Sequence, residues 1–312
     1  MLNKEKNFVS AVIYVHNAER RIGNFLDMII GSMERNFEHS EIICVNDCSD
    51  DDSVDVIKKI SDKAETTSVS LVNMSFFHGL ELAMDAGRDL AIGDFVFEFD
   101  NTILDFDPEM IMQIYHHSLT GYDIVSVSPN KKKKLSSCFF YKVFGIFADN
   151  ACDMTTESFR ILSRRVINRI CSMNKTIPYR KAIYAGCGLK TANFKYEVKN
   201  DVENNIDPKE KKYRSSLAID TMILFTEFGY RFSFWMTSAM MLVSVLMILY
   251  TVIVYLIGHP IEGWTTTLLF LSVAFLGLFG ILTIIVKYLQ LIVDMVFKRK
   301  HYNFEGIEKL TK

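Results

Sequence analysis

Apolar residues in the first 130 positions occur in two alternating patterns. Short, nearly continuous apolar runs are typical of strands buried on both faces of a parallel sheet, and segments with helical spacing of apolar residues lie between them. The predicted strands cover residues 8–15, 41–45, 69–74, 94–99 and 122–128, and the predicted helices cover 18–36, a segment holding Val54, Ile57 and Ile60, 78–92 and 108–118. Elements alternating in this way predict an α/β fold with a parallel, doubly wound sheet.

After residue 232 the pattern changes to two long runs without charged residues, 234–257 and 264–286. Each run has about 23 residues, enough to cross a hydrocarbon core of roughly 30 Å. Neither run has the polar face of a buried core helix. The short segment 258–263 between them has glycine at both ends and a proline. We therefore expect two transmembrane helices in a hairpin.

Basic residues flank the outer ends of this hairpin. Arg231 precedes the first run, and Lys287 and the basic triplet 298–300 follow the second. The positive-inside rule then places both outer ends in the cytoplasm. The first residues carry charges, as in Lys4 and Lys6, and no apolar stretch of a signal peptide. We expect an integral membrane protein with its large polar domain and both termini in the cytoplasm.

The composition argues against several classes of protein. Lys and Arg total 35 against 37 Asp and Glu, so there is no overall signature of nucleic-acid binding. The six cysteines are scattered without a C-x-x-C pair, and free thiols are expected in a reducing compartment. No G-x-G-x-x-G follows the first strand and no Walker A run occurs, so neither an NAD site nor a P-loop is expected.

Closely spaced carboxylates, Asp100, Asp105 and Asp107, follow the predicted strand 94–99. Ligands of open α/β sheets bind at the carboxyl ends of the strands, where carboxylates suit Mg²⁺ or Mn²⁺ carrying a diphosphate. Pro108 and Glu109 then indicate the first turn of a helix, with Asp107 as N-cap and Pro108 at the first helical position. The alternative interpretation is an acidic loop with an ordinary helix cap.

A second acidic cluster, 46–52, follows the second predicted strand and should meet the loop of the first strand at the same sheet edge. Asp47 could accept hydrogen bonds from a nucleotide base or ribose there. Alternatively it caps the next helix, a role that Ser49, Asp50 or Asp51 could also fill.

Several motifs together resemble those of glycosyltransferase family 2, and specifically its membrane-bound polyprenyl-phosphate glycosyltransferases. Residues 12–19 (VIYVHNAE) stand where the family has V-V-P-V-Y-N-E-E, 45–50 (VNDCSD) where it has V-D-D-G-S-x-D, and Gly79 with 83–87 (AMDAG) where it has G-K-x-x-A-x-x-A-G. Residues 93–94 and 100–109 correspond to G-D followed by D-x-D-L-Q-D-P-P-E, and 157–165 (ESFRILSRR) to G-D-F-R-L-L-S-R-R. The resemblance covers nearly the whole chain.

The resemblance implies a GT-A fold and an inverting enzyme of the bacterial inner membrane. It would move a sugar from a nucleotide sugar, with a UDP-sugar as the expected donor, to undecaprenyl phosphate or a similar polyprenyl phosphate. The family includes oligomers, so a homo-oligomer is compatible with it. The implied organisation is a cytoplasmic GT-A domain over 1–200, juxtamembrane amphipathic helices over 201–230, the hairpin over 231–297 and a basic cytoplasmic tail over 298–312.

The resemblance also implies roles for individual residues. The expected catalytic residues are Asp100, Asp105 and Arg160, and the expected ligands of Mg²⁺ or Mn²⁺ are Asp100 and Asp105, with Thr102 as a weak third. Binding of the nucleotide sugar is expected from Tyr14, Val15, Asn17, Glu19, Asp47, Ser49, Gly79 and Asp100. The acceptor phosphate is expected to contact Arg160, Ser137, Tyr141, Arg180 and Lys212.

The chain also departs from the family pattern. Leu80 stands for the lysine after Gly79, and Thr102 stands for the second aspartate of D-x-D. A hydroxyl is a weaker ligand than a carboxylate, so the metal site is rearranged, metal dependence is weak, or catalysis is lost. Two other functions stay open: a glycosyltransferase with another lipid or glycan acceptor, and a catalytically impaired membrane scaffold.

Overall fold

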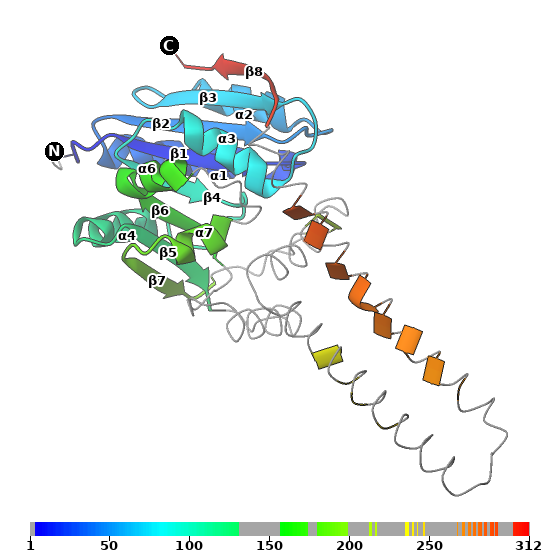
Figure 1. The fold of residues 1–312 in the computed structure, drawn as a ribbon. Helices are drawn as coiled ribbons and strands as arrows, with labels where there is room; N and C mark the ends of the chain where they lie inside the picture. The colour runs from blue at the N-terminus through cyan, green and yellow to red at the C-terminus, as the bar shows by residue number, and fades with distance from the viewer. Residues whose placement is uncertain are drawn as a thin grey trace, which may run out of the picture.

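The computed structural model describes residues 4–130, 157–173, 180–198 and 302–311, together with scattered positions between 212 and 292. These residues form one eight-stranded sheet with the order β7-β5-β6-β4-β1-β2-β3-β8 (Figure 1). The strands are β1 (Val9–Val15), β2 (Ser40–Asn46), β3 (Ser68–Met74), β4 (Phe95–Phe99), β5 (Ile124–Pro129), β6 (Phe159–Ser163), β7 (Thr191–Tyr196) and β8 (Phe304–Lys309).

The sheet is mixed. β1 pairs in parallel with both β2 and β4, and β2 pairs in parallel with β3, as the alternating pattern predicts. β6 is antiparallel to its neighbours β4 and β5, and β8 is antiparallel to β3. The α/β prediction is therefore confirmed, but the sheet is not wholly parallel. The register of β4 with β6 places Glu98 opposite Arg160.

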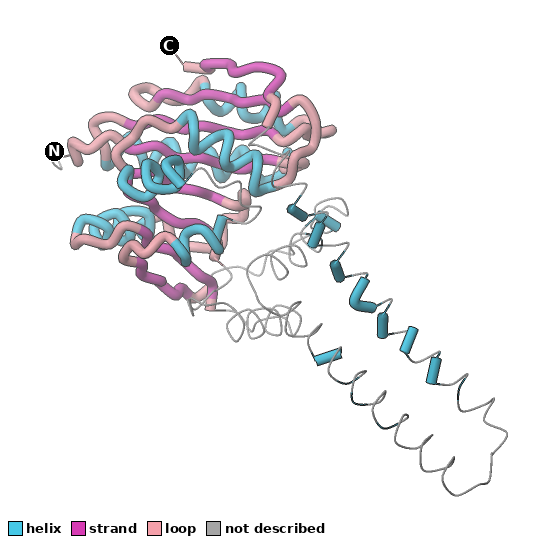
Figure 2. Tube along the Cα trace, viewed as in Figure 1, coloured by secondary structure: helices cyan, strands magenta, loops and turns pink. Residues whose placement is uncertain are grey.

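Helices cover both faces of the sheet (Figure 2). They are α1 (Glu19–Asn36), α2 (Ser53–Ser61), α3 (Leu80–Leu90), α4 (Glu109–Leu119), α6 (Arg164–Met173) and α7 (Arg180–Gly186). Apolar residues of α1, α2 and α4 pack with one face of the strands, and those of α3, α6 and α7 pack with the other. Along β4, Phe97 and Phe99 belong to the first core and Val96 to the second. Strand alternation therefore turns Glu98 and Asp100 toward the α3 and α7 face.

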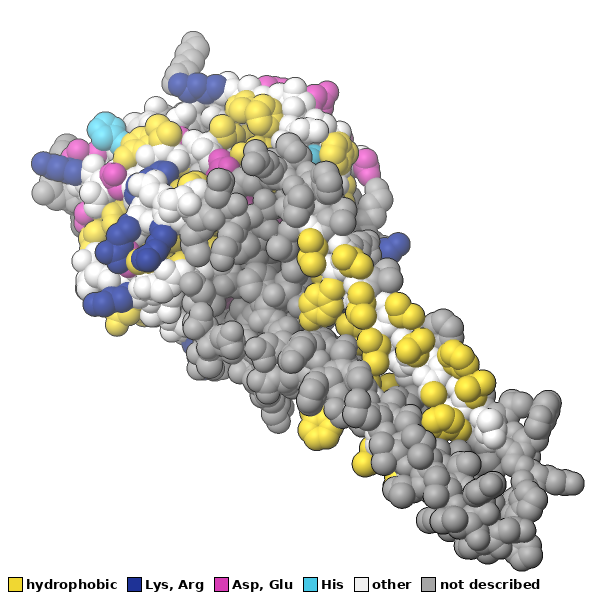
Figure 3. Space-filling view, viewed as in Figure 1, with side chains coloured by type: hydrophobic (Ala, Val, Ile, Leu, Met, Phe, Trp, Pro, Cys, Tyr) yellow, Lys and Arg dark blue, Asp and Glu magenta, His cyan; other side chains and the backbone are white. Residues whose placement is uncertain are grey.

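Much of the predicted membrane region, including most of 201–230 and of the runs 234–257 and 264–286, lies outside the described residues. In the part of the chain that is described, none of the helices combines the length and the apolar character needed to cross a bilayer. The described positions between 267 and 292 are helical. Seven of their large apolar side chains are exposed by 45–55% (Figure 3): Leu271, Phe275, Leu278, Leu282, Ile285, Leu289 and Ile292.

The C-terminal segment returns to the sheet. β8 pairs with β3 from Ser70↔Lys309 to Met74↔Phe304, with one irregularity near Met74. Residues 304–309, which the sequence assigned to a basic tail, thus form an edge strand.

Candidate functional site

The loops after β1 and β2 hold each other at one edge of the sheet. The Asn17 N–H donates to Ser49 Oγ at 3.1 Å, and the Asp50 N–H donates to Asn17 Oδ1 at 2.9 Å. The Glu19 N–H donates to Asp51 Oδ2 at 3.0 Å. Asn17 has a φ of 46°, a left-handed conformation that asparagine adopts more readily than most residues. The structure therefore brings Asn17, Glu19 and Ser49 together, as the sequence predicts.

Asp47 is the anchor of this edge. Its carboxylate is fully buried and accepts hydrogen bonds from the backbone N–H groups of His78 and Gly79, both at 2.8 Å, and from the Tyr14 hydroxyl at 3.1 Å. Burial raises the pKa of Asp47, while these donors favour its charged form. Asp47 thus joins β1, β2 and the loop after β3, and it does not cap α2. Its contact with a nucleotide stays a prediction.

Gly79 lies directly beneath the ring of Tyr213. A Cβ at Gly79 would be 2.4 Å from Tyr213 Cζ, and the Gly79 φ of 84° favours glycine. Phe77 makes an edge contact with the same ring, with the centroids 6.1 Å apart. A residue from the segment before the first long apolar run therefore packs on the loop that holds Asp47.

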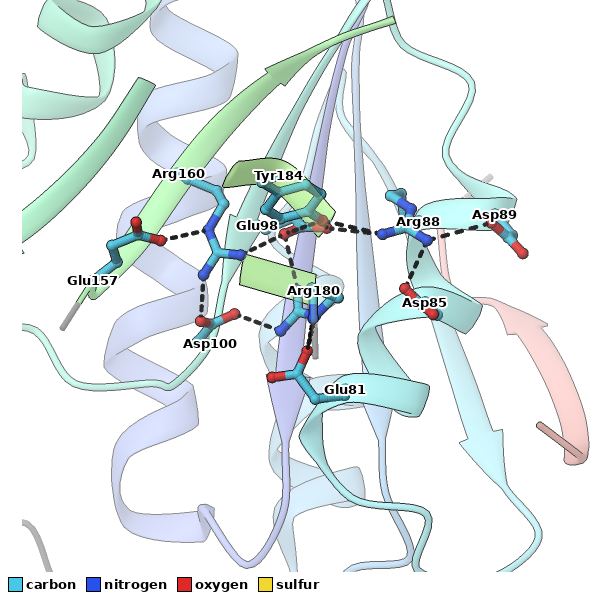
Figure 4. Close-up of polar contacts among 10 residues, drawn as sticks. All are labelled: Glu81, Asp85, Arg88, Asp89, Glu98, Asp100, Glu157, Arg160, Arg180 and Tyr184. Atoms are coloured by element: carbon cyan, nitrogen blue, oxygen red, sulfur yellow. Dashed lines mark hydrogen bonds and ion pairs between the residues drawn. The ribbon is translucent and has the colours of Figure 1, made fainter. Parts of the chain in front are cut away.

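Two arginines enclose Glu98 of β4 and Asp100, the residue directly after that strand (Figure 4). Asp100 Oδ2 accepts from Arg160 Nη2 at 2.7 Å, and Asp100 Oδ1 accepts from Arg180 Nη2 at 2.8 Å. Glu98 Oε2 accepts from Arg180 Nη1 at 2.9 Å and from Arg160 Nη1 at 3.3 Å. All four side chains are buried. The structure thus brings together Asp100, Arg160 and Arg180, three residues predicted for the site. Their charged groups pair with one another, whereas the sequence predicts that they contact a metal ion or phosphate groups.

This buried network extends along α3 and α7. The backbone N–H and Nε of Arg180 both donate to Glu81 Oε2 at 2.9 Å. Tyr184 donates its hydroxyl hydrogen to Glu98 and accepts from Arg88 Nη1 at 3.0 Å. Glu81, Arg88, Glu98 and Tyr184 are not among the site residues predicted from the sequence. One signal was present, because Glu98 interrupts an otherwise apolar strand and a buried glutamate requires a partner.

Opposite charges determine the ionisation of these groups. Burial raises the pKa of Asp100, but the charges of Arg160 and Arg180 outweigh it and hold that pKa well below its ordinary value. Burial also raises the pKa of Asp85, against the charge of Arg88, whose Nη2 lies 2.6 Å from Asp85 Oδ1. Arg160 Nε is 3.1 Å from Glu157 Oε2, although its direction does not meet the geometry of a hydrogen bond.

The other predicted metal ligands do not converge with Asp100. Asp105 Oδ1 accepts from the Tyr196 hydroxyl at 2.6 Å, and Tyr196 in turn is 2.8 Å from Ser158 Oγ. Thr102 is only 4% exposed. Within the described ranges, no three His, Cys, Asp or Glu side chains are grouped as a metal site. The residues present in this conformation therefore do not fit a divalent ion.

The remaining predicted residues lie apart from this network. Val15 is buried in the core, and only its backbone carbonyl, which accepts from the Asp47 N–H at 2.9 Å, reaches the edge. Lys212 is exposed. Ser137 and Tyr141 lie outside the described residues. Their proposed contacts with the acceptor phosphate stay predictions.

The segment before β8 contacts the same edge from another side. The Asn303 N–H donates to His78 Nε2 at 3.2 Å, and the Ser75 N–H donates to the Asn303 carbonyl at 3.0 Å. Tyr302 donates its hydroxyl hydrogen to Asp89 Oδ2 at 2.9 Å. The loop between β3 and α3 is therefore held both by Tyr213 and by Asn303.

Residues 10–136, which carry the loops after β1, β2, β3 and β4, match the model of the family described as Glycosyl transferase family 2. The chain thus contains a glycosyltransferase family 2 domain at residues 10–136. It is 29% identical over 189 residues to an uncharacterized glycosyltransferase of Synechocystis sp., a match that covers 58% of each chain. It is 25% identical over 193 residues to the uncharacterized glycosyltransferase YkcC of Bacillus subtilis, covering 60% of this chain and 59% of that one. The matched region thus spans less than two thirds of either relative.

A longer match joins this glycosyltransferase to a prophage bactoprenol glucosyl transferase homolog of Escherichia coli. The two are 26% identical over 284 residues, which is 86% of this chain and 88% of the relative.

Among solved structures, mannosyl-3-phosphoglycerate synthase from Rubrobacter xylanophilus is similar with a TM-score of 0.51 and 17% identity, over 70% of this chain and 73% of that one. Glucosyl-3-phosphoglycerate synthase from Mycobacterium tuberculosis, in complex with Mn²⁺, UDP and phosphoglyceric acid, is similar with a TM-score of 0.50 and 15% identity, over 70% and 78%. At these identities the likeness confirms the GT-A fold of the glycosyltransferase.

Proposed function

We propose that this glycosyltransferase is membrane-bound and transfers a sugar from a UDP-sugar to a polyprenyl phosphate, such as undecaprenyl phosphate, with inversion at C1. The observation that carries the proposal is the match to the bactoprenol glucosyl transferase homolog over 86% of this chain. That length exceeds the family domain, 10–136, and so includes part of the chain beyond it.

The described C-terminal part supports attachment to a membrane. Leu271, Phe275, Leu278, Leu282, Ile285, Leu289 and Ile292 repeat at alternating steps of four and three residues and are exposed (Figure 3). Exposed apolar side chains at this spacing form a stripe along a helix. Such a stripe is unfavourable in water and favourable against lipid.

The path of the chain supports a hairpin. β7 precedes the first long apolar run, β8 follows the second, and both belong to the same sheet. The two runs therefore begin and end at one domain, as an even number of membrane crossings requires. With basic residues at the outer ends, this domain would be cytoplasmic at the bacterial inner membrane.

The edge formed by the loops after β1 and β2 is the expected donor site. These loops are fixed to each other through Asn17 and Ser49, and Asp47 fixes the loop after β3 to both. A phosphate monoester has a second pKa of about 6 and is already an anion near neutral pH. A phosphate oxygen can therefore form the new bond to C1 while the bond from C1 to the UDP oxygen breaks, without a strong general base.

The experiment is transfer by membranes that contain the full-length chain. Candidate UDP-sugars labelled in the sugar are supplied with undecaprenyl phosphate, and lipid-linked product and released UDP are measured separately. We expect a lipid-linked product that Asp105→Asn abolishes and the exposed-site control Asp62→Asn keeps. UDP release with a water-soluble glycan product would show that the acceptor is a glycan and not a polyprenyl phosphate. No turnover with any UDP-sugar would contradict the whole proposal.

One observation favours a second function, a catalytically impaired scaffold. The D-x-D motif lacks its second aspartate, and the first, Asp100, is bound by two buried guanidinium groups. A scaffold would require the membrane and a protein partner but no sugar transfer. Sugar transfer by the wild type that is lost in Asp105→Asn would exclude the scaffold function.

A further inference from the structure

Both oxygens of the Asp100 carboxylate are already paired with cations. Oδ2 is 2.7 Å from Arg160 Nη2 and Oδ1 is 2.8 Å from Arg180 Nη2. Exposure of the residues is 6% for Asp100, 0% for Arg160 and 1% for Arg180. Charge-assisted hydrogen bonds of this length are the strong ones in proteins.

The two guanidinium groups are themselves held in place. Arg180 is fixed to Glu81 through Nε and the backbone N–H, and to Glu98 through Nη1. Arg160 is fixed to Glu98 from the neighbouring strand, in register with it. If either arginine turned away, Asp100 would lose one of its two charge-assisted hydrogen bonds in a buried site, which is unfavourable.

A divalent ion at Asp100 would have to displace these groups or lie beside them. Displacement leaves two buried guanidinium charges next to the new cation, and approach beside them brings like charges together in a poorly solvated site. The second D-x-D position offers only the buried hydroxyl of Thr102, and Asp105 is hydrogen-bonded to Tyr196. Lys181, which follows Arg180 and is only partly buried, adds a third positive charge that acts on Asp100.

We infer that Asp100 is the internal counter-ion of Arg160 and Arg180 and not a metal ligand, so that nucleotide binding by this chain is independent of divalent ions. The inference rests on the proposed function, because it assumes a nucleotide at this edge. Asp100 is then a positioning residue, which acts by holding two arginines on β6 and α7.

The test measures UDP binding to the purified full-length chain in detergent micelles, by calorimetry, with EDTA and with excess Mn²⁺. We expect dissociation constants that agree within about twofold, since no metal bridges the diphosphate. Binding at least about tenfold tighter with Mn²⁺ would overturn the inference. The exposed Arg169→Lys variant is the control for the purification and should bind UDP as the wild type does.

Absence of UDP binding in both conditions would contradict the proposed function. The role of Asp100 is then tested by a second measurement, which needs no nucleotide. Electron paramagnetic resonance then reports bound Mn²⁺ without nucleotide. No immobilised Mn²⁺, or immobilised Mn²⁺ that Asp100→Asn and Asp105→Asn both retain, supports the inference. The inference would be overturned if either of these variants failed to bind Mn²⁺ while the control Asp62→Asn still bound it. Asp105 is partly exposed, so its variant serves if Asp100→Asn fails to fold.

Discussion

Glu98 Oε2 lies 2.9 Å from Arg180 Nη1, although the two residues are 82 positions apart in the sequence. The contact joins a central strand, β4, to α7 on one face of the sheet. It links a segment of the family domain, 10–136, to a segment outside that domain. The two parts of the chain are therefore coupled through buried charges as well as through strand pairing.

Glu98→Gln should destabilise the protein strongly. Glu98 is fully buried and accepts hydrogen bonds from Arg160, Arg180 and Tyr184. Loss of its charge removes one of the buried carboxylates that compensate these guanidinium groups, which costs about 3–5 kcal/mol. Denaturant unfolding followed by circular dichroism measures the change. Glu109→Gln, at an exposed position in the first turn of α4, should leave stability within about 0.5 kcal/mol. A Glu98→Gln variant as stable as this control would show that the network contributes little.

Acid should weaken the fold through Asp100. The pKa of Asp100 is depressed in the folded state by Arg160 and Arg180, so its contribution is complete above the unfolded pKa of about 3.9 and is lost as pH falls below it. Between pH 5 and pH 3 this group should cost about 1 kcal/mol of stability. Unfolding at several pH values, in wild type and Asp100→Asn, checks it, because the variant should lack this part of the slope. Parallel pH profiles would contradict the prediction.

Gly79→Ala should cost more than Gly121→Ala. Both glycines have positive φ, 84° and 99°, so both substitutions carry a backbone penalty of about 1–3 kcal/mol. Only at Gly79 would the new Cβ collide with another residue, Tyr213, whereas it meets nothing within 4 Å at Gly121. Thermal unfolding of both variants gives the comparison. Tyr213→Ala in the Gly79→Ala background should recover the part due to collision, and equal losses at both glycines would exclude the collision.

Removal of β8 should expose the edge of β3. Truncation after Asn303 deletes the partner strand of residues 70–74, and the unpaired edge becomes a template for intermolecular pairing. We expect a lower unfolding midpoint and aggregation, detected by light scattering of the detergent-purified protein. Removal of Lys312 alone leaves every pair of β8 in place and should have no effect. A truncated protein that stays monodisperse with an unchanged midpoint would contradict this role of β8.

Periodicity predicted the elements of the first 130 residues closely. The expected strand 8–15 is Val9–Val15, and the expected helix 18–36 is Glu19–Asn36. The expected helix at Pro108 begins at Glu109, with Pro108 as its N-cap, while the Glu109 N–H donates to Asp107 Oδ1 at 3.1 Å. Apolar spacing fixes such elements because each buries one face locally. It could not show that β6 inserts antiparallel between β4 and β5, because strand order depends on contacts between distant segments.

The parallel pairing of β1 with β2 and β4 confirms the sheet edge on which the candidate site was predicted, while the binding of ligands there stays a prediction. Loop composition placed Asn17, Asp47 and Asp100 at one sheet edge, because the carboxyl ends of parallel strands share that edge. The environment of Arg160 differs from the open phosphate contact we expected, since its side chain is buried among Asp100, Glu98 and Glu157. The pairings of Arg160 with Asp100 and Glu98 join residues 60 and 62 positions apart, and no local pattern encodes them.

The return of the chain to β3 makes the long apolar segment an insertion within one sheet and not an appendage at its end. A shortened protein that stops before residue 231 would lack a strand, so it should be a poor soluble substitute for the whole. A short polar linker from the end of the juxtamembrane segment to Tyr302 would instead keep β8, Asn303 and the hydrogen bond to His78. Such an internal deletion would remove the long apolar segment while keeping all eight strands of the sheet.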